Sequence, residues 1–172
     1  MSEIILRKYH GVGNDYLIFD PKKNDVVLNE RLIRQLCRRN IGVGADGILY
    51  GPVMEDKKIK VRIFNPDGSE AEKSGNGIRC LGKYVYDHGK TEKVNLLIET
   101  DAGLYRLQLI KKEDTDRICS VRVDMGTPEF VPEHISARFL LFRPVCVSMG
   151  NPHCVLSVSY THLRAHETEL HL

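Results

Sequence analysis

The stretch NPDGSEAEKSGNGIRC, residues 65–80, places Ser74 and the run Gly75-Asn76-Gly77 directly before a predicted helix at residues 78–87. The first turn of a helix offers unpaired backbone N–H groups at the positive end of its dipole, which together form a cradle for an anion. Asn76 either adds a side-chain donor to this cradle or caps the helix. A carboxylate needs fewer positive charges than a phosphate, so we expect the anion to be a carboxylate.

Further asparagines lie in glycine-containing loops of the same character. Asn14 stands in GND, Asn65 follows an apolar run, and Asn151 stands in GNP. Each of them alone is better explained as an ordinary turn residue. Taken together, several loop asparagines suit an α-amino acid, which presents both a carboxylate and an ammonium group.

Two other candidate sites are rejected on their context. Gly42, Gly44 and Gly47 satisfy the pattern GxGxxG, but they follow a predicted helix and precede an apolar run, whereas a dinucleotide fingerprint follows a strand and opens a helix. Cys146 and the pair His153–Cys154 lack a fourth ligand at a suitable spacing. We therefore expect neither a metal nor a nucleotide cofactor.

The elements that must position these residues follow from hydrophobic periodicity. Strands are predicted on both sides of the glycine loop HGVGND, and Asn29 is a predicted N-cap for a first helix. Strands and two short helices without regular βαβ alternation indicate an α+β fold. The predicted strands are residues 3–9, 16–20, 59–64, 96–100, 104–110, 118–124 and 139–148, and the predicted helices are residues 30–39 and 78–87.

The composition is that of a globular chain with a core. The 172 residues are 42% hydrophobic and 28% charged, with a formal net charge of +2, so one domain, or one domain and part of another, is expected. This mild charge argues against nucleic-acid binding, and no apolar run is long enough for a membrane span or a signal peptide. The five scattered cysteines indicate reduced thiols in the cytoplasm.

Several motifs together resemble the diaminopimelate epimerase family. They are KYHGVGNDY (residues 8–16), FNPDGSEAEKSGNGIRC (64–80), ETDAG (99–103), VDMGTP (123–128) and GNPHC (150–154), and their order and spacing fit the family across residues 3–156. The resemblance implies two pseudo-symmetric α+β domains, each a curved sheet wrapped around a central helix, with the substrate in the cleft between them. It also implies an enzyme without cofactor or metal, in which one cysteine thiolate removes the α-proton and a second thiol returns one.

The family's functional residues carry over by position. Asn14, Asn65, Gly75, Asn76 and Asn151 match substrate-binding positions, and the resemblance places the substrate carboxylate at helix N-termini.

Two positions depart from the family pattern. Ser74 stands at the position of the first catalytic cysteine, and Gly47 stands where the family often has glutamine. A serine hydroxyl is a far weaker acid than a thiol, so it acts as a base only with a neighbouring partner, such as Lys73 or His10. Donation of a proton to a carbanion-like intermediate suits it better. Cys80 matches a family cysteine that is not the acid–base residue, and we expect it to face the core.

The resemblance ends near residue 157, which divides the chain into an N-terminal epimerase domain at residues 1–124, a truncated second domain at 125–157, and a tail at 158–172. Residues 158–168, VSYTHLRAHET, have no counterpart in the family. They translate a nucleotide sequence that resembles a transposase adapter of sequencing libraries, so the tail is expected not to be native. A strand that completes the first domain and the second catalytic cysteine are then missing, and the chain is expected to be inactive alone and marginally stable.

The resemblance predicts a cofactor-independent epimerase that converts LL-diaminopimelate to meso-diaminopimelate, in lysine and peptidoglycan-precursor biosynthesis. Alternatives are a racemase of another amino acid that uses a serine–cysteine pair, and a non-catalytic amino-acid binder. A carboxylate-using isomerase of the same fold, as in phenazine biosynthesis, is disfavoured because that family lacks the NPDGS…SGNG pattern. The expected partner is a small amino-acid substrate, with no nucleic acid and no membrane, and the full-length protein is expected to form a homodimer.

Overall fold

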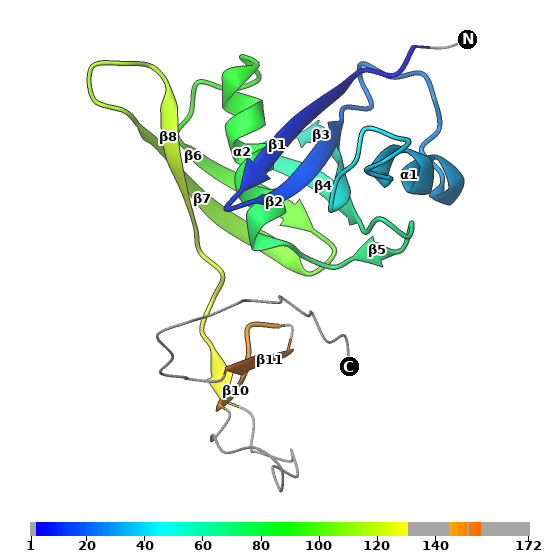
Figure 1. Ribbon diagram of the computed structural model, residues 1–172. Coiled ribbons are helices and arrows are strands. Elements are labelled where there is room, and N and C mark those ends of the chain that lie inside the picture. Colours follow the sequence, from blue (N-terminus) through cyan, green and yellow to red (C-terminus); the bar gives the residue numbers. More distant parts are fainter. Residues whose placement is uncertain (1–2, 131–144, 151, 156–172) are drawn as a thin grey trace, which may run out of the picture. The chain divides into compact units, whose positions relative to one another are not determined.

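The computed structural model describes residues 3–130, 145–150 and 152–155, and it divides into two compact units, Met1–Met125 and Gly126–Leu172 (Figure 1). Each unit is described by itself. The domain assignment at 1–124, 125–157 and 158–172 stays a prediction. Asn151 and the tail at 158–172 lie outside the described residues.

The first unit contains an eight-stranded sheet in the order β1-β2-β3-β4-β6-β7-β8, with the short strand β5 paired to β4. The sheet is mixed: β2–β3 and β4–β6 are parallel pairs, and the other pairs are antiparallel. The strands are β1 Leu6–Gly11, β2 Asn14–Phe19, β3 Gly47–Glu55, β4 Lys58–Phe64, β5 Glu70–Ala71, β6 Asn95–Thr100, β7 Gly103–Lys111 and β8 Ile118–Val123.

The helix α2, Gly75–Asp87, lies at the centre of this unit. It contacts β1 and β8, the strands at the two ends of the sheet order, and also β2, β3, β6 and β7. Figure 1 shows the sheet curving around this green helix. Ile78, Leu81 and Val85 are each 0% exposed, because their spacing puts them on one face of the helix. The predicted α+β class, with a curved sheet wrapped around a central helix, is confirmed.

The second helix, α1 Glu30–Cys37, begins as predicted, since the Asn29 side chain accepts a hydrogen bond from the Leu32 N–H at 2.9 Å. It ends two residues earlier than expected. A Cβ at Gly42 would lie 2.0 Å from the Gln35 carbonyl oxygen, so only glycine permits this return of the chain. The glycine-rich segment leads from α1 into β3, which is why the nucleotide-binding interpretation fails.

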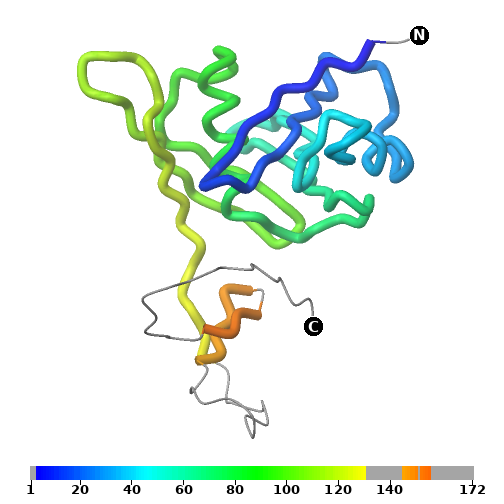
Figure 2. The backbone as a smooth tube through the Cα atoms, viewed as in Figure 1, coloured from blue at the N-terminus to red at the C-terminus, as the bar shows by residue number. Residues whose placement is uncertain are grey.

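The hairpin β1–β2 is tighter than the sequence predicted. The smooth trace of Figure 2 shows the two strands in dark blue, and only Val12 and Gly13 connect them. Both residues have positive φ, 56° and 88°, as a two-residue turn between antiparallel strands requires. The strands therefore extend into HGVGND, and Asn14 is the first residue of β2 rather than a loop residue.

The strands β4, β6, β7 and β8 agree with their predicted positions to within one residue, whereas β3 and β5 were not predicted. In the second unit, β9 Glu129–Phe130, β10 Val145–Ser148 and β11 Pro152–Val155 form a three-stranded sheet in the order β11-β10-β9. Residues 145–148 of the strand predicted at 139–148 are confirmed, and residues 139–144 lie outside the described part. Among the described residues, no helix is long and apolar enough to cross a membrane.

Candidate functional site

Ser74 is the N-cap of α2. Its Oγ accepts a hydrogen bond from the Gly77 N–H at 3.1 Å, and its carbonyl oxygen accepts one from the Ile78 N–H at 2.9 Å. The helix thus begins at Gly75, three residues earlier than predicted, and the Gly75-Asn76-Gly77 run forms its first turn. Asn76 is not the cap, because the shorter serine side chain reaches the N3 amide from the cap position.

The two glycines of the first turn have different roles. A Cβ at Gly77 would lie 3.0 Å from Leu49 Cδ2 and 3.3 Å from Ser74 Oγ, so glycine lets the turn pack closely. A Cβ at Gly75 would make only ordinary contacts with the Met125 side chain. Among the described residues, neither the Gly75 nor the Asn76 N–H has a hydrogen-bond acceptor. These two amides are therefore available for an anion.

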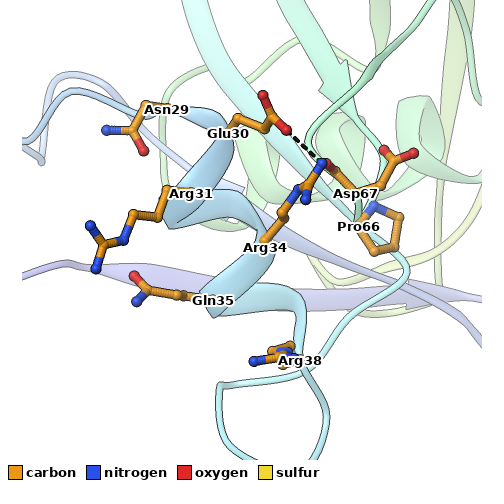
Figure 3. A pocket seen from close by; sticks show the side chains of 8 residues that line it. All are labelled: Asn29, Glu30, Arg31, Arg34, Gln35, Arg38, Pro66 and Asp67. Carbon is orange, nitrogen blue, oxygen red and sulfur yellow. Dashed lines mark hydrogen bonds and ion pairs between the residues drawn. The ribbon is translucent and has the colours of Figure 1, made fainter.

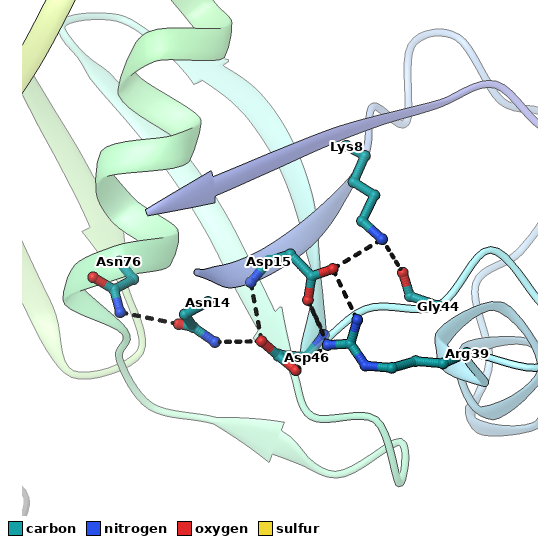
Figure 4. Close-up of polar contacts among 7 residues, drawn as sticks. All are labelled: Lys8, Asn14, Asp15, Arg39, Gly44, Asp46 and Asn76. Atoms are coloured by element: carbon teal, nitrogen blue, oxygen red, sulfur yellow. Dashed lines mark hydrogen bonds and ion pairs between the residues drawn. The ribbon is translucent and has the colours of Figure 1, made fainter. Parts of the chain in front are cut away.

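Asn14 and Asn76 are 62 residues apart in the sequence and contact each other directly (Figure 4). The Asn76 Nδ2 donates to Asn14 Oδ1 at 3.1 Å, and the Asn14 Nδ2 donates to Asp46 Oδ2 at 3.0 Å. The Arg79 guanidinium donates to Asn76 Oδ1. The amide orientations of both asparagines are therefore fixed by protein partners before any ligand binds.

Behind Asn14 lies a network of charged residues. The Asp15 carboxylate accepts hydrogen bonds from Arg39 at 2.7 and 3.1 Å and forms an ion pair with Lys8 at 2.8 Å. The Asp15 N–H donates to Asp46 Oδ2 at 3.0 Å, and Arg39 also contacts Asp46 (Figure 4). The Arg39 hydrogen bonds hold the pKa of Asp15 well below its ordinary range, although burial opposes this shift. Through Asp46, which accepts hydrogen bonds from the Asp15 N–H and the Asn14 side chain, the network also holds Asn14.

Tyr16 is a site residue that the sequence analysis missed. Its hydroxyl oxygen lies 2.8 Å from Ser74 Oγ. Tyr16 is buried, and this burial raises the pKa of its phenol. Neither Lys73 nor His10, the expected partners of Ser74, hydrogen-bonds the serine hydroxyl within the described residues. The alternation of side chains along β2 could have indicated that Tyr16 and Asn14 share a face.

Asn65 is engaged in a turn rather than in the hydrogen bonds of the Asn14–Asn76 pair. Its Nδ2 donates to Ser69 Oγ at 3.0 Å, and its backbone N–H donates to the Ser69 carbonyl oxygen at 2.8 Å. These bonds close the NPDGS turn at the end of β4, and within the described residues none joins Asn65 to Asn14 or Asn76. The structure thus brings together Ser74, Gly75, Asn76 and Asn14 among the predicted site residues, while Asn151 lies outside the described residues.

Cys80 faces the core, as predicted. It is 3% exposed, and burial raises the pKa of its thiol to about 11. A neutral, buried thiol of this kind is a packing group rather than an acid–base residue. Within the described residues, no three histidine, cysteine, aspartate or glutamate side chains gather as a metal site would require.

A cavity of about 880 Å³ lies beside α1 and contains none of these site residues. Figure 3 shows that arginine side chains of α1 line it. Arg34 is already engaged, because it pairs with Glu30 at 2.5 Å and donates to the Asp67 carbonyl oxygen at 2.6 Å. The lining residues are Asn29, Glu30, Arg31, Arg34, Gln35, Arg38, Pro66 and Asp67. This cavity is therefore separate from the Ser74 cluster.

Solved structures of other proteins share this fold. A phenazine biosynthesis protein of the PhzF family from Bacillus anthracis superposes with a TM-score of 0.69 at 22% identity, covering 92% of this chain and 57% of that protein. A hydroxyproline epimerase from Agrobacterium vitis superposes with a TM-score of 0.61 at 14% identity, covering 88% of this chain and 50% of that protein. At these identities the likeness concerns the fold alone.

Sequence comparisons are more specific. A diaminopimelate epimerase from Moorella thermoacetica is 42% identical over 166 residues, which cover 88% of this chain and 59% of that protein. One from Leptospira biflexa is 37% identical over 171 residues, which cover 91% of this chain and 61% of that protein. The chain thus spans about three fifths of the length of these curated relatives. A profile of the family described as diaminopimelate epimerase matches residues 6–131. With the curved sheet, the central helix and the Asn14–Ser74–Asn76 cluster in place, the chain belongs to the diaminopimelate epimerase family.

Proposed function

We propose that this chain supplies one side of the active site of a cofactor-independent amino-acid epimerase, which converts LL-diaminopimelate to meso-diaminopimelate for lysine and peptidoglycan-precursor biosynthesis. The observation that carries the proposal is the position of Ser74. Its hydroxyl lies at the amino end of α2, beside the free amides of Gly75 and Asn76 and within the same cluster as Asn14. Two relatives that are 42% and 37% identical are named diaminopimelate epimerase.

The substrate carboxylate would bind at the amino end of α2. The N–H groups of Gly75 and Asn76 point out of the first turn, and the helix dipole favours negative charge there. The fixed amides of Asn14 and Asn76 would orient the amino acid, with Asn65 and Asn151 as further proposed substrate contacts. Such placement of the α-carbon against a proton-transfer group accounts for much of an enzyme's rate advantage.

Ser74 would act on one face of the substrate's α-carbon. A serine hydroxyl is too weak an acid to exist as an alkoxide at neutral pH, so we assign it proton donation rather than proton abstraction. Abstraction of the α-proton requires a second group on the opposite face. A serine–cysteine pair of this kind would also suit a racemase of another amino acid.

A non-catalytic amino-acid binder is the second candidate, and one observation favours it. The Ser74 oxygen accepts a hydrogen bond from Gly77 and lies 2.8 Å from the Tyr16 hydroxyl. These contacts are those expected of a helix-capping residue, so they would be present even if Ser74 transferred no proton.

Binding can be tested on the chain itself by nuclear magnetic resonance titration. We expect LL-diaminopimelate to shift the backbone amide signals of Gly75 and Asn76, and cadaverine, which lacks carboxylates, to leave them unchanged. Asn76→Ala should weaken binding about tenfold, the loss of one hydrogen bond to a charged group. The exposed Asn95 provides the control, since Asn95→Ala should bind as the parent chain does. Equal shifts with cadaverine would contradict a carboxylate site.

An assay of turnover distinguishes an epimerase from a non-catalytic amino-acid binder. Residues 1–155 can be joined to the part of the Moorella thermoacetica relative that this chain does not match, and α-proton exchange of LL-diaminopimelate can be followed in deuterium oxide. We expect exchange by this chimera, and exchange at least about 100-fold faster after Ser74→Cys, the typical contribution of a well-matched acid–base group. If the Ser74→Cys chimera exchanges the α-proton and the chimera that retains Ser74 does not, the chain with serine at this position is a non-catalytic binder.

Cytoplasmic location and a homodimer belong to the same proposal. Cys119 and Cys154 are exposed thiols in the structure, which suits a reducing compartment. The homodimer of the full-length protein stays a prediction.

A further inference from the structure

The ring of Tyr16 lies in a space that Gly47 leaves open. Tyr16 on β2 and Gly47 on β3 are direct partners in the parallel pair. A Cβ at position 47 would lie 2.8 Å from Tyr16 Cε1, 3.2 Å from Tyr16 Cδ1, and 2.5 Å from the Phe64 carbonyl oxygen. Real side chains do not approach so closely. Any larger residue at position 47 would therefore displace the ring or the strand beside it.

From this space the Tyr16 hydroxyl reaches Ser74. The two oxygens are 2.8 Å apart, although the residues are separated by 58 positions in the sequence. Tyr16 is only 8% exposed, and a buried hydroxyl hydrogen requires an acceptor. Ser74 Oγ lies at hydrogen-bonding distance from this hydroxyl, and the distance alone permits either group to be the donor. The phenol is the stronger acid of the two hydroxyls, which favours Tyr16 as the donor and the serine oxygen as the acceptor.

Ser74 Oγ also receives the Gly77 N–H at 3.1 Å. A hydroxyl oxygen has two lone pairs and carries one hydrogen. With Tyr16 and Gly77 as donors, both lone pairs are occupied and only the serine hydrogen remains to be given. The oxygen is thus a poor acceptor for a substrate proton, while its O–H is free to donate at the amino end of α2.

We propose that Tyr16 is a positioning residue that, in the space left by Gly47, sets the Ser74 hydroxyl as a hydrogen-bond donor toward the bound amino acid. The inference deepens the proposed function and rests on it for the identity of the acceptor, which would be a substrate carboxylate or the carbanion-like intermediate. It also links two sequence features that looked independent. The glycine at position 47 accommodates the tyrosine ring, and the tyrosine hydroxyl satisfies the serine oxygen.

The hydrogen bond can be tested without any substrate, by converting position 74 into a thiol whose pKa reports its donors. Ser74→Cys and the double variant Ser74→Cys/Tyr16→Phe are prepared in the 172-residue chain. The rate of alkylation of residue 74 by iodoacetamide is then measured against pH by peptide mass spectrometry, which separates residue 74 from the other cysteines. A donor to the thiolate lowers its pKa. We therefore expect alkylation in the double variant to be about tenfold slower below the thiol pKa, equivalent to one pKa unit.

Tyr105 supplies the matched control. It belongs to the same core cluster and is 9% exposed, close to the 8% of Tyr16. Ser74→Cys/Tyr105→Phe should show the pH profile of Ser74→Cys alone. Gly47→Ala in the Ser74→Cys background should slow alkylation in the same direction as Tyr16→Phe, because the added methyl group displaces the ring.

An unchanged profile after Tyr16→Phe would overturn the proposal, since the ring is retained and only the hydroxyl is lost. A change of equal size after Tyr105→Phe would assign the effect to general loosening of the core. Neither result depends on an amino acid being bound. Failure of this inference is therefore distinguishable from failure of the proposed function, which the titration and the deuterium exchange decide.

Discussion

Replacing Leu81 with alanine is expected to lower the free energy of unfolding by about 3 kcal/mol, in the middle of the range for buried leucines. Leu81 lies on the central helix and is 0% exposed. It belongs to the cluster formed by α2 and the strands curved around it. Because α2 contacts both ends of the sheet order, a cavity beneath it removes contacts from several strands at once. Urea unfolding followed by circular dichroism measures the change.

Leu104 is the control for this substitution. It lies on β7 and is 53% exposed, so Leu104→Ala removes the same atoms from a position that already faces solvent. We expect a loss of less than about 1 kcal/mol there. Similar losses at both positions would mean that α2 is not the centre of the cooperative core. A lower slope of the unfolding transition in Leu81→Ala would instead indicate a less compact folded state.

Asp15→Asn is expected to cost about 2 kcal/mol of stability at neutral pH, the effect of removing a charged hydrogen-bond partner. The Asp15 side chain is 10% exposed, whereas its partners Lys8 and Arg39 are 43% and 56% exposed. Because solvent screens those partners, the loss should be smaller than for a fully buried ion pair. Asp25, which is exposed, provides a matched control, since Asp25→Asn should change stability by less than about 0.5 kcal/mol.

The lowered pKa of Asp15 determines how the stability difference between the parent chain and Asp15→Asn changes with pH. The folded state holds the pKa of Asp15 below its ordinary value of 3.8, so the carboxylate stabilises the fold at every pH above that value. The contribution is lost as the pH falls through the depressed pKa of the folded state. The difference in unfolding free energy between the parent and Asp15→Asn should therefore be constant from pH 7 to about 5 and should shrink below 4. A difference that grows on acidification would show that Asp15 does not bear the charge.

This network also matters for the site, because it continues into Asn14. The same Asp46 carboxylate that accepts the Asp15 N–H also accepts the Asn14 Nδ2. Loss of the Asp15 charge should therefore release Arg39 and Asp46 together. Any effect on ligand binding would then arise from a misplaced Asn14 rather than from a direct contact.

Local patterns in the sequence predicted the elements well. Apolar patterns placed six of the eight strands of the first unit within a few residues of their observed bounds, and Asn29 was correctly identified as a cap, but β3 and β5 were missed. Predictions were less accurate where two signals competed. In HGVGND the glycines indicated a long loop, but pairing of β1 with β2 extended both strands and left a two-residue turn. At α2 the glycines delayed the predicted start, whereas packing of Gly77 against Leu49 and capping by Ser74 begin the helix at Gly75.

The sequence by itself determined the α+β class, the membership of the diaminopimelate epimerase family, and the importance of the segment around Ser74 and Asn76. These follow from periodicity, turn chemistry and motif order, which are properties of neighbouring residues. Only the tertiary structure decided that Asn14 contacts Asn76, that Asp15 binds Arg39, and that Tyr16 reaches Ser74. These contacts join residues 62, 24 and 58 positions apart, and they depend on which strands pair and in which register. Hydrophobic patterning fixes which face of a strand is buried, but not the neighbour against which that face is placed.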